Sequence, residues 1–182
     1  MMTIAVYCGS SGGNEPAYQD AARTLGAWIG ENGHTLIYGG GQSGLMGLVA
    51  QQVYERDGRV IGVLPQNVSF IRSRPQPYCT ELITCESMSA RKQRMLELAD
   101  AFFALPGGIG TLDEITEAIT LTHIGVFEKP SVLFNVNGYY EPLRAMLKKM
   151  RDAAFFRVGK KPYVLFSDDL REIGAFLSLW KT

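Results

Sequence analysis

Short apolar runs alternate with longer amphipathic stretches along the whole chain. Each run is continuously apolar and rich in β-branched and aromatic residues, a pattern typical of strands that are covered on both faces. We therefore predict strands at 3–8, 35–39, 59–64, 101–105, 130–135 and 162–166, with a weaker seventh at 81–85.

The stretches between these runs repeat their apolar residues with the period of a helix. They predict helices at about 16–32, 43–57, 87–99, 111–125, 139–152 and 168–181. Because strand–helix alternation requires right-handed crossovers, the sheet should be parallel. We predict an α/β, three-layer Rossmann-like fold of about seven strands with helices on both faces, in a single domain spanning residues 1–182. Residues 65–80 contain three prolines and predict either an ordered loop near a site or partner, or a plain surface excursion.

The composition narrows the class of protein. The 182 residues carry 18 basic and 18 acidic side chains, so nothing favours a nucleic acid or a membrane surface as partner. Three cysteines without a C-x-x-C pair, and only two histidines, argue against a structural zinc site and favour a reducing compartment. The start of the chain lacks a signal-peptide pattern, and no run reaches the ~18 apolar residues of a membrane span. We expect a soluble, cytoplasmic protein without a bound metal.

Three of the predicted strands end in loops rich in glycine and serine, at 9–13, 39–44 and 106–111. Ligands of parallel sheets bind beyond the carboxyl ends of the strands. Glycine also leaves backbone N–H groups uncovered, which suits an anion. One such loop is ordinary turn chemistry, but three at the same edge predict a binding site. We assign Ser10, Gly40 and Gly41 to it.

The glycine spacing does not favour a dinucleotide as the anion. Gly39, Gly41 and Gly44 match G-x-G-x-x-G, but that motif requires an acidic residue at the end of the next strand to hold the ribose. The next strand ends at Pro65, and Asp57 lies before it. The P-loop pattern G-x-x-x-x-G-K-[ST] is absent as well. A single phosphate is the simpler ligand.

The predicted helix in residues 86–101 places two cations within its apolar face. On a helical wheel, Arg91 and Lys92 fall inside this face, where an unpaired charge would be costly. They are either snorkelling stems or a buried ion pair with Glu86 or Asp100, or they are directed at a bound anion or at the carboxylates that open the next helix. The apolar residues of this face are Met88, Met95, Leu96, Leu98 and Ala99.

The segment ALPGGIGTLDE (104–114) allows two interpretations. Thr111 and Glu114 match the capping box S/T-x-x-E, in which the glutamate only starts a helix. Alternatively, the glycines form an anion site and Glu114 acts on the ligand held there.

Four segments carry a resemblance to a known family: GGGQSGLMG (39–47), MSARKQRM (88–95), LPGGIGTLDE (105–114) and KPSVLFNVNGYY (129–140). In matching order over nearly the whole chain, they resemble the LONELY GUY (LOG) family, cytokinin-activating phosphoribohydrolases long mislabelled as lysine decarboxylases. The R-K pair followed by P-G-G-x-G-T-x-x-E is the specific part. The resemblance implies hydrolysis of the N-glycosidic bond of a nucleoside 5′-monophosphate, either a cytokinin riboside 5′-monophosphate or AMP, to free base and ribose 5-phosphate.

The resemblance also implies roles for individual residues. Arg91 and Glu114 correspond to the catalytic pair, Lys92 and Thr120 to further substrate contacts, and we add Met88 from the R-K motif. The phosphate loop corresponds to Gly107, Gly108, Gly110 and Thr111. Family members are at least dimeric with sites near the interface, so we expect a homodimer or larger homo-oligomer. Ser87, Ser89 and Leu121 differ from the aspartate, histidine and tryptophan usual in the family, which leaves the preferred base open.

The residues themselves suit such a reaction. Cleavage of a ribosyl–base bond passes through an oxocarbenium-like state that a carboxylate, here Glu114, stabilises while it deprotonates water. Arg91 would hold Glu114 or a substrate hydroxyl. Asp113 is a candidate general acid but fits better as a solvent-facing helix residue, and His123 fits best as a hydrogen-bonded helix residue. No metal or cofactor is needed. Two rivals are a pyridoxal-phosphate decarboxylase using Lys92 and a non-catalytic nucleotide carrier.

Overall fold

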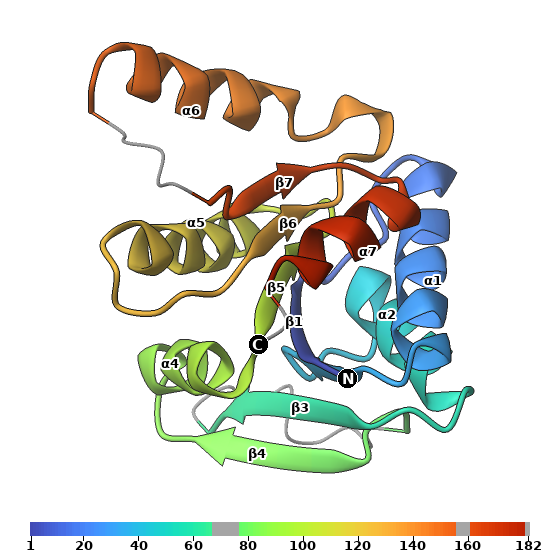
Figure 1. Cartoon of the computed structure of the whole chain (residues 1–182). Helices are drawn as coiled ribbons and strands as arrows, with labels where there is room; N and C mark the ends of the chain where they lie inside the picture. The colour runs from blue at the N-terminus through green and yellow to red at the C-terminus, as the bar shows by residue number, and fades with distance from the viewer. Residues whose placement is uncertain (67–76, 156–160, 181–182) are drawn as a thin grey trace.

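A single parallel sheet forms the centre of the molecule (Figure 1). The computed structural model describes residues 1–66, 77–155 and 161–180. Within these residues the sheet has seven strands in the order β4-β3-β2-β1-β5-β6-β7, so all seven predicted strands are confirmed. Residues 67–76 of the predicted loop 65–80 lie outside the described residues. The strands are β1 (Thr3–Tyr7), β2 (Thr35–Tyr38), β3 (Val60–Pro65), β4 (Glu81–Cys85), β5 (Ala101–Ala104), β6 (Ser131–Leu133) and β7 (Val164–Phe166).

Helices cover both faces of this sheet, as predicted. Helices α1, α2 and α7 pack on one face and α4 and α5 on the other, while α6 lies beyond the edge strand β7 (Figure 1). No helix among the described residues is long and apolar enough to cross a membrane. The helices are α1 (Pro16–Glu31), α2 (Gly44–Tyr54), α4 (Met88–Leu98), α5 (Ile109–His123), α6 (Glu141–Asp152) and α7 (Leu170–Ser178), with a 3₁₀ turn η1 (Val136–Gly138).

The central strand β1 shows why its sequence is apolar without interruption. Ile4 and Val6 belong to the core under α1, α2 and α7, whereas Ala5 and Tyr7 belong to the core under α4 and α5. Successive side chains of a strand point to opposite faces, so a strand covered on both sides has no polar position. The edge strand β4 is largely exposed, which explains why its apolar pattern is the weakest.

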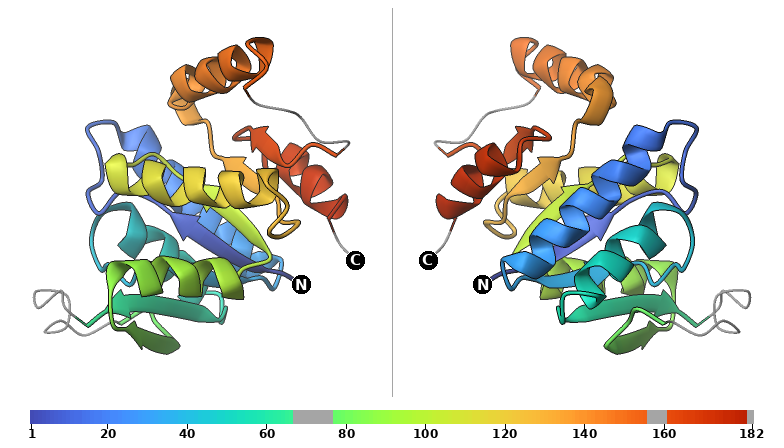
Figure 2. Two further views of the ribbon diagram at one scale, coloured as in Figure 1. Left: turned by 90° about the vertical axis from the view of Figure 1, so that its left-hand side faces the viewer. Right: turned by 90° about the vertical axis from the view of Figure 1, so that its right-hand side faces the viewer.

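The strand order creates a crevice beside β1. The chain moves outward from β1 to β4 and then returns through α4 to β5, which pairs with β1 on its other side. Connections therefore reverse direction at β1, the position where open α/β sheets bind ligands. Helices α4 and α5, which precede and follow β5 in the chain, lie side by side on one face (Figure 2).

Candidate active site

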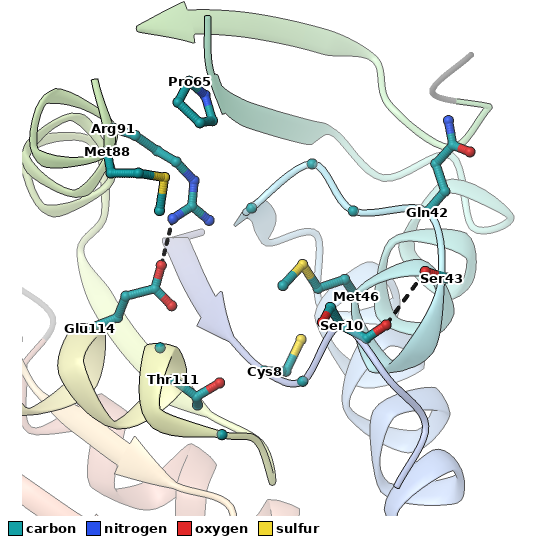
Figure 3. A pocket seen from close by; sticks show the side chains of 16 residues that line it. Cys8, Ser10, Gln42, Ser43, Met46, Pro65, Met88, Arg91, Thr111 and Glu114 are labelled. Atoms are coloured by element: carbon teal, nitrogen blue, oxygen red, sulfur yellow. Dashed lines mark hydrogen bonds and ion pairs between the residues drawn. The ribbon is translucent and has the colours of Figure 1, made fainter. Parts of the chain in front are cut away.

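A cavity of about 390 Å³ lies at the carboxyl ends of the central strands (Figure 3). The loop after β1 lines it with residues 8–10, the loop after β2 with residues 39–43, and the start of α5 with Gly108, Gly110 and Thr111. The predicted convergence of the three glycine-rich loops at one edge is confirmed. Helix α4 closes a further side.

An ion pair between α4 and α5 forms part of the wall of this cavity. Arg91 Nη1 donates a 2.6 Å hydrogen bond to Glu114 Oε1, and the two side chains are only 7% and 10% exposed. Arg91 Nε donates to the Val63 carbonyl oxygen at 3.0 Å. The predicted facing of Arg91 and Glu114 is therefore confirmed, and the alternative partners Glu86 and Asp100 do not take this position. Figure 3 shows both side chains directed at each other across the cavity wall.

Burial and the ion pair with Arg91 have opposite effects on the pKa of Glu114. Burial raises the pKa of its carboxyl above the ordinary 4.5, and the Arg91 guanidinium offsets only part of this increase. Arg91 binds Oε1, so Oε2 remains for a water or a substrate hydroxyl. A carboxylate that is buried, oriented and half-satisfied can accept a proton or stabilise a nearby positive charge.

Gly39 explains part of the glycine pattern after β2. A β-carbon built on Gly39 would overlap Nη2 of Arg91. The absence of a side chain at this position therefore admits the guanidinium. Gly44 has a φ of 62°, and a β-carbon there would overlap the backbone of Ser10. The match to G-x-G-x-x-G thus reflects close approaches of Arg91 and of the β1 loop.

Lys92 points away from the cavity. Its Nζ lies 2.8 Å from Asp113 Oδ2 and 3.0 Å from Glu117 Oε2. Hydrogen bonds from Lys92 to these carboxylates raise the pKa of its ammonium group. Because an imine with pyridoxal phosphate needs a neutral amine in the cofactor site, this geometry opposes the decarboxylase alternative.

The loop after β5 presents unpaired backbone donors. Helix α5 starts at Ile109 with Gly108 as its N-cap residue and no side-chain cap. Among the described residues, no acceptor bonds the N–H groups of 107–111. Thr111 is therefore inside the helix rather than its cap, and Glu114 binds Arg91 instead of reaching back. The capping-box interpretation is wrong, because the helix begins before the threonine.

The remaining predicted residues divide into two groups. Ser10, Gly40, Gly41 and Met88 line the cavity with the loop residues above. Among the described residues that line the cavity, Gly107, Lys92 and Thr120 do not occur. The Thr120 hydroxyl donates a 2.7 Å hydrogen bond to the Thr116 carbonyl.

The structure also places the two candidate acid–base residues. Asp113 binds Lys92, and His123 Nδ1 lies 2.9 Å from the Tyr163 hydroxyl. His123 is thus a hydrogen-bonded helix residue, as favoured in the sequence, and Asp113 is a solvent-facing residue of the first helical turns, as favoured, although it also pairs with Lys92.

Sequence reasoning missed three lining residues, Cys8, Met46 and Pro65. Each directly adjoins a strand end or a glycine loop, which is the only signal that could have indicated them. Burial raises the pKa of the Cys8 thiol, which disfavours the thiolate form that a nucleophile requires.

Comparison with known proteins gives the family. A family model described as "Possible lysine decarboxylase" matches residues 46–176. The cytokinin riboside 5′-monophosphate phosphoribohydrolase LOG of Oryza sativa subsp. japonica is 39% identical over 170 residues, 93% of this chain and 70% of that protein. The chain belongs to the LOG family. Another LOG-family protein, the cytokinin riboside 5′-monophosphate phosphoribohydrolase LOG2 of Arabidopsis thaliana, is 42% identical over 152 residues, 84% of this chain and 71% of that protein.

Solved structures share the fold of this LOG-family chain. The X-ray structure of TM1055 has a TM-score of 0.73 at 24% identity, covering 98% of this chain and 99% of that one. The molybdenum cofactor binding protein from Rippkaea orientalis has a TM-score of 0.71 at 22% identity, covering 98% and 97%. At these identities the likeness concerns the fold alone, since one fold supports many functions.

Proposed function

We propose that this chain hydrolyses the N-glycosidic bond of a nucleoside 5′-monophosphate, releasing the free base and ribose 5-phosphate. One observation carries the proposal: a buried carboxylate oriented by an arginine shares a cavity with unpaired N–H groups at a helix start. The named activity of the relatives supports the same reaction.

Glu114 is the proposed catalytic carboxylate. Breaking the ribosyl–base bond builds positive charge on the anomeric carbon. The ionised Glu114 stabilises this charge and accepts a proton from the attacking water through Oε2. No covalent intermediate is required.

Arg91 is proposed to keep Glu114 ionised and oriented. Two of its nitrogens are engaged, Nη1 with Glu114 and Nε with the Val63 carbonyl, so the guanidinium is held in one orientation. A planar fork fixed at two points suits this task better than a lysine ammonium group would.

The substrate phosphate is proposed to bind at the loop 106–111. Helix starts with free N–H groups favour anions, and Gly108, Gly110 and Thr111 line the cavity there. Binding the remote phosphate fixes the ribose over Glu114, so binding energy contributes to turnover. Met88, Met46 and Cys8 add apolar contact area suited to the base.

The remaining predictions concern assembly and location. We propose that the chain forms at least a homodimer, and that Lys92 and Thr120, which lie outside the cavity lining, contact the substrate. We also propose that the protein is located in the cytoplasm. Its three cysteines are free thiols, which agrees with a reducing compartment.

The decisive experiment is incubation of the purified protein with AMP and with a cytokinin riboside 5′-monophosphate, followed by chromatography for the free base. We expect base and ribose 5-phosphate in equal amounts, and much slower release from adenosine, which lacks the phosphate. Comparable kcat/KM for AMP and adenosine would contradict the phosphate site. Tight AMP binding without turnover would favour a carrier instead.

A further inference from the structure

Two consecutive tyrosines contact the backbone of the proposed phosphate loop. The Tyr139 hydroxyl donates a 2.6 Å hydrogen bond to the Gly107 carbonyl, and the Tyr140 hydroxyl donates a 2.7 Å bond to the Leu105 carbonyl. Both tyrosines directly follow η1, so in the sequence α5 and β6 separate them from the loop. Neither has a role in the reaction as proposed above.

These two bonds complete a set that holds every carbonyl of the turn. The Pro106 carbonyl accepts from the Gly9 N–H at 3.1 Å, and the Gly108 carbonyl accepts from the Leu112 N–H at 3.1 Å. From Leu105 to Gly108, each carbonyl therefore has a donor, while the N–H groups of 107–111 have no acceptor within the described part of the chain.

Peptide planarity converts this pattern into a direction for the donors. In a trans peptide the N–H of the next residue points opposite to the carbonyl. The bond from Tyr139 to the Gly107 carbonyl therefore fixes the direction of the Gly108 N–H, and Gly108 lines the cavity. The bond from Tyr140 fixes a peptide whose nitrogen belongs to Pro106, which has no N–H. The two hydroxyls thus have different consequences.

The tyrosines are themselves held rigidly. Asn137 and Gly138 have φ values of 51° and 70°, which turn the chain tightly before them. The Tyr139 and Tyr140 rings meet edge to face with centroids 5.0 Å apart, and Tyr18 packs against Tyr139 at 5.6 Å. Tyr140 is buried and Tyr139 is partly exposed. A hydroxyl on such a support can set the orientation of a peptide.

We propose that Tyr139 is a positioning residue that directs the Gly108 N–H at the substrate phosphate, while Tyr140 anchors the start of the same loop. This inference rests on the proposed phosphate site and adds to it the device that orients its donors. The loop is rich in glycine, the residue type that loses the most conformational freedom when it becomes ordered. Without these two hydrogen bonds, the substrate would have to order the loop on binding.

The test compares three variants that each remove one hydroxyl, Tyr139→Phe, Tyr140→Phe and Tyr18→Phe. Calorimetry measures ribose 5-phosphate binding, and thermal unfolding gives Tm. We expect Tyr139→Phe to bind ribose 5-phosphate about fivefold more weakly with an unchanged Tm, the scale of one lost hydrogen bond. Tyr140→Phe should lower Tm, because it leaves a buried carbonyl unpaired. Tyr18 packs on Tyr139, but its hydroxyl binds Glu15, so Tyr18→Phe is the matched control and should change neither quantity.

A second readout separates positioning from a structural role. In Tyr139→Phe, the ratio of kcat/KM for AMP to that for adenosine should fall by about the same fivefold factor, because only AMP uses the phosphate donors. Equal ribose 5-phosphate affinity in wild type and Tyr139→Phe would overturn the inference, as would an equal loss in Tyr18→Phe. A wild-type protein that binds ribose 5-phosphate but leaves AMP intact would contradict the hydrolase proposal alone, since the binding comparison still decides the role of Tyr139.

Discussion

Gly39 occupies the point where β2 ends and the Arg91 guanidinium passes against its α-carbon. A methyl group at this position would overlap Nη2 of Arg91, and Arg91 is held on its other sides by Val63 and Glu114. If position 39 carried a methyl group, the Arg91 side chain could move aside only by breaking its hydrogen bond to Val63 or to Glu114. The glycine acts through the space it leaves, in contrast to Gly40 and Gly44, which have positive φ values.

Gly39→Ala should consequently reduce turnover without unfolding the protein. We expect kcat for AMP to fall at least about tenfold, because displacement of Arg91 releases Glu114 from its productive orientation. Gly174→Ala is the matched control: Gly174 lies inside α7 with open space around it, so alanine should keep activity and stabilise the helix. Steady-state kinetics and circular dichroism of both variants provide the measurement. Normal kcat in Gly39→Ala would show that Arg91 tolerates the shift.

Glu114→Gln separates chemistry from structure at the same pair. Glutamine keeps the size of the side chain and its hydrogen-bonding carbonyl but cannot carry negative charge. We expect AMP turnover to fall by on the order of 10²-fold or more, while the circular dichroism spectrum and ribose 5-phosphate binding persist. Asp113→Asn, which changes the adjacent carboxylate outside the cavity lining, should keep most of the turnover. Near-normal hydrolysis by Glu114→Gln would make the carboxylate structural.

The pKa of Glu114 predicts where activity declines in acid. Burial raises this pKa above 4.5, and the proposed reaction needs the ionised form, so kcat/KM should decrease as pH falls through a value above 4.5. The folding contribution has the opposite sign: a carboxyl with a raised folded pKa stabilises the native state at low pH, and this contribution is lost as pH rises. The pH profile of kcat/KM tests the first statement. Ribose 5-phosphate binding by Glu114→Gln over the same range corrects for ionisation of the phosphate, and an acid limb at or below 4.5 would refute the shift.

At the scale of elements, the sequence predicted the strands better than the helix starts. Seven apolar runs became seven strands because burial on both faces leaves a clear pattern. Helix α5 instead begins at Ile109, before the predicted start at 111. The T-x-x-E pattern is the same for a capping threonine and for an interior threonine followed by a glutamate that pairs elsewhere. The start of α5 at Ile109 and the pairing of Glu114 with the distant Arg91 distinguish the two.

The apolar face of α4 was likewise predicted only in part. Met95, Leu96 and Ala99 are buried as expected, but Met88 is 51% exposed and lines the cavity. Arg91 is buried in the place of an apolar residue. A helical wheel identifies the inward face but cannot tell a core contact from a cavity wall, because that distinction depends on the opposing loop.

Helix α4 carries Arg91, and its N-terminus is set by Ser87. The Ser87 hydroxyl oxygen accepts a 3.1 Å hydrogen bond from the Ala90 N–H. Serine and the aspartate usual in the family are both good N-cap residues, so this departure preserves the start of the helix. Ser87→Ala should cost about 1 kcal/mol and lower Tm by about 2–4 °C. Ser89→Ala, an exposed serine in the first turn of the same helix, should have no such effect, and equal Tm values for both variants would contradict the cap.

At the scale of the whole molecule, topology brings the site together. The sheet order places the loops after β1, β2 and β5 at one edge, which the strand–helix alternation was sufficient to predict. The contacts of Arg91 with Gly39 and Val63, and those of Tyr139 with Gly107, join segments far apart in the chain. They depend on side-chain packing across the crevice, for which a single sequence contains no periodic signal.

Exposed apolar side chains lie on α5 and α4 close in sequence to residues that line the cavity. Ile109 and Leu112, one turn apart on α5, are 82% and 39% exposed, and Met88 at the cavity wall is 51% exposed. Exposed apolar groups next to a site mark an interaction surface, and a two-fold pairing of copies is the commonest way to cover one. We therefore predict that this surface forms the interface of the proposed homodimer.

Light scattering during size-exclusion chromatography tests this assembly. We expect a mass of about twice the 20.1 kDa of the single chain, or a higher multiple. Ile109→Glu should shift the population toward the monomer, because a charge placed in an apolar interface loses its hydration. Leu179→Glu is the matched control: Leu179 is 57% exposed at the end of α7, a helix whose buried residues belong to the core on the other face of the sheet, and its replacement should leave the mass unchanged. A wild-type monomer at all concentrations would contradict the prediction, and dissociation by Leu179→Glu alone would place the interface on the α7 face instead.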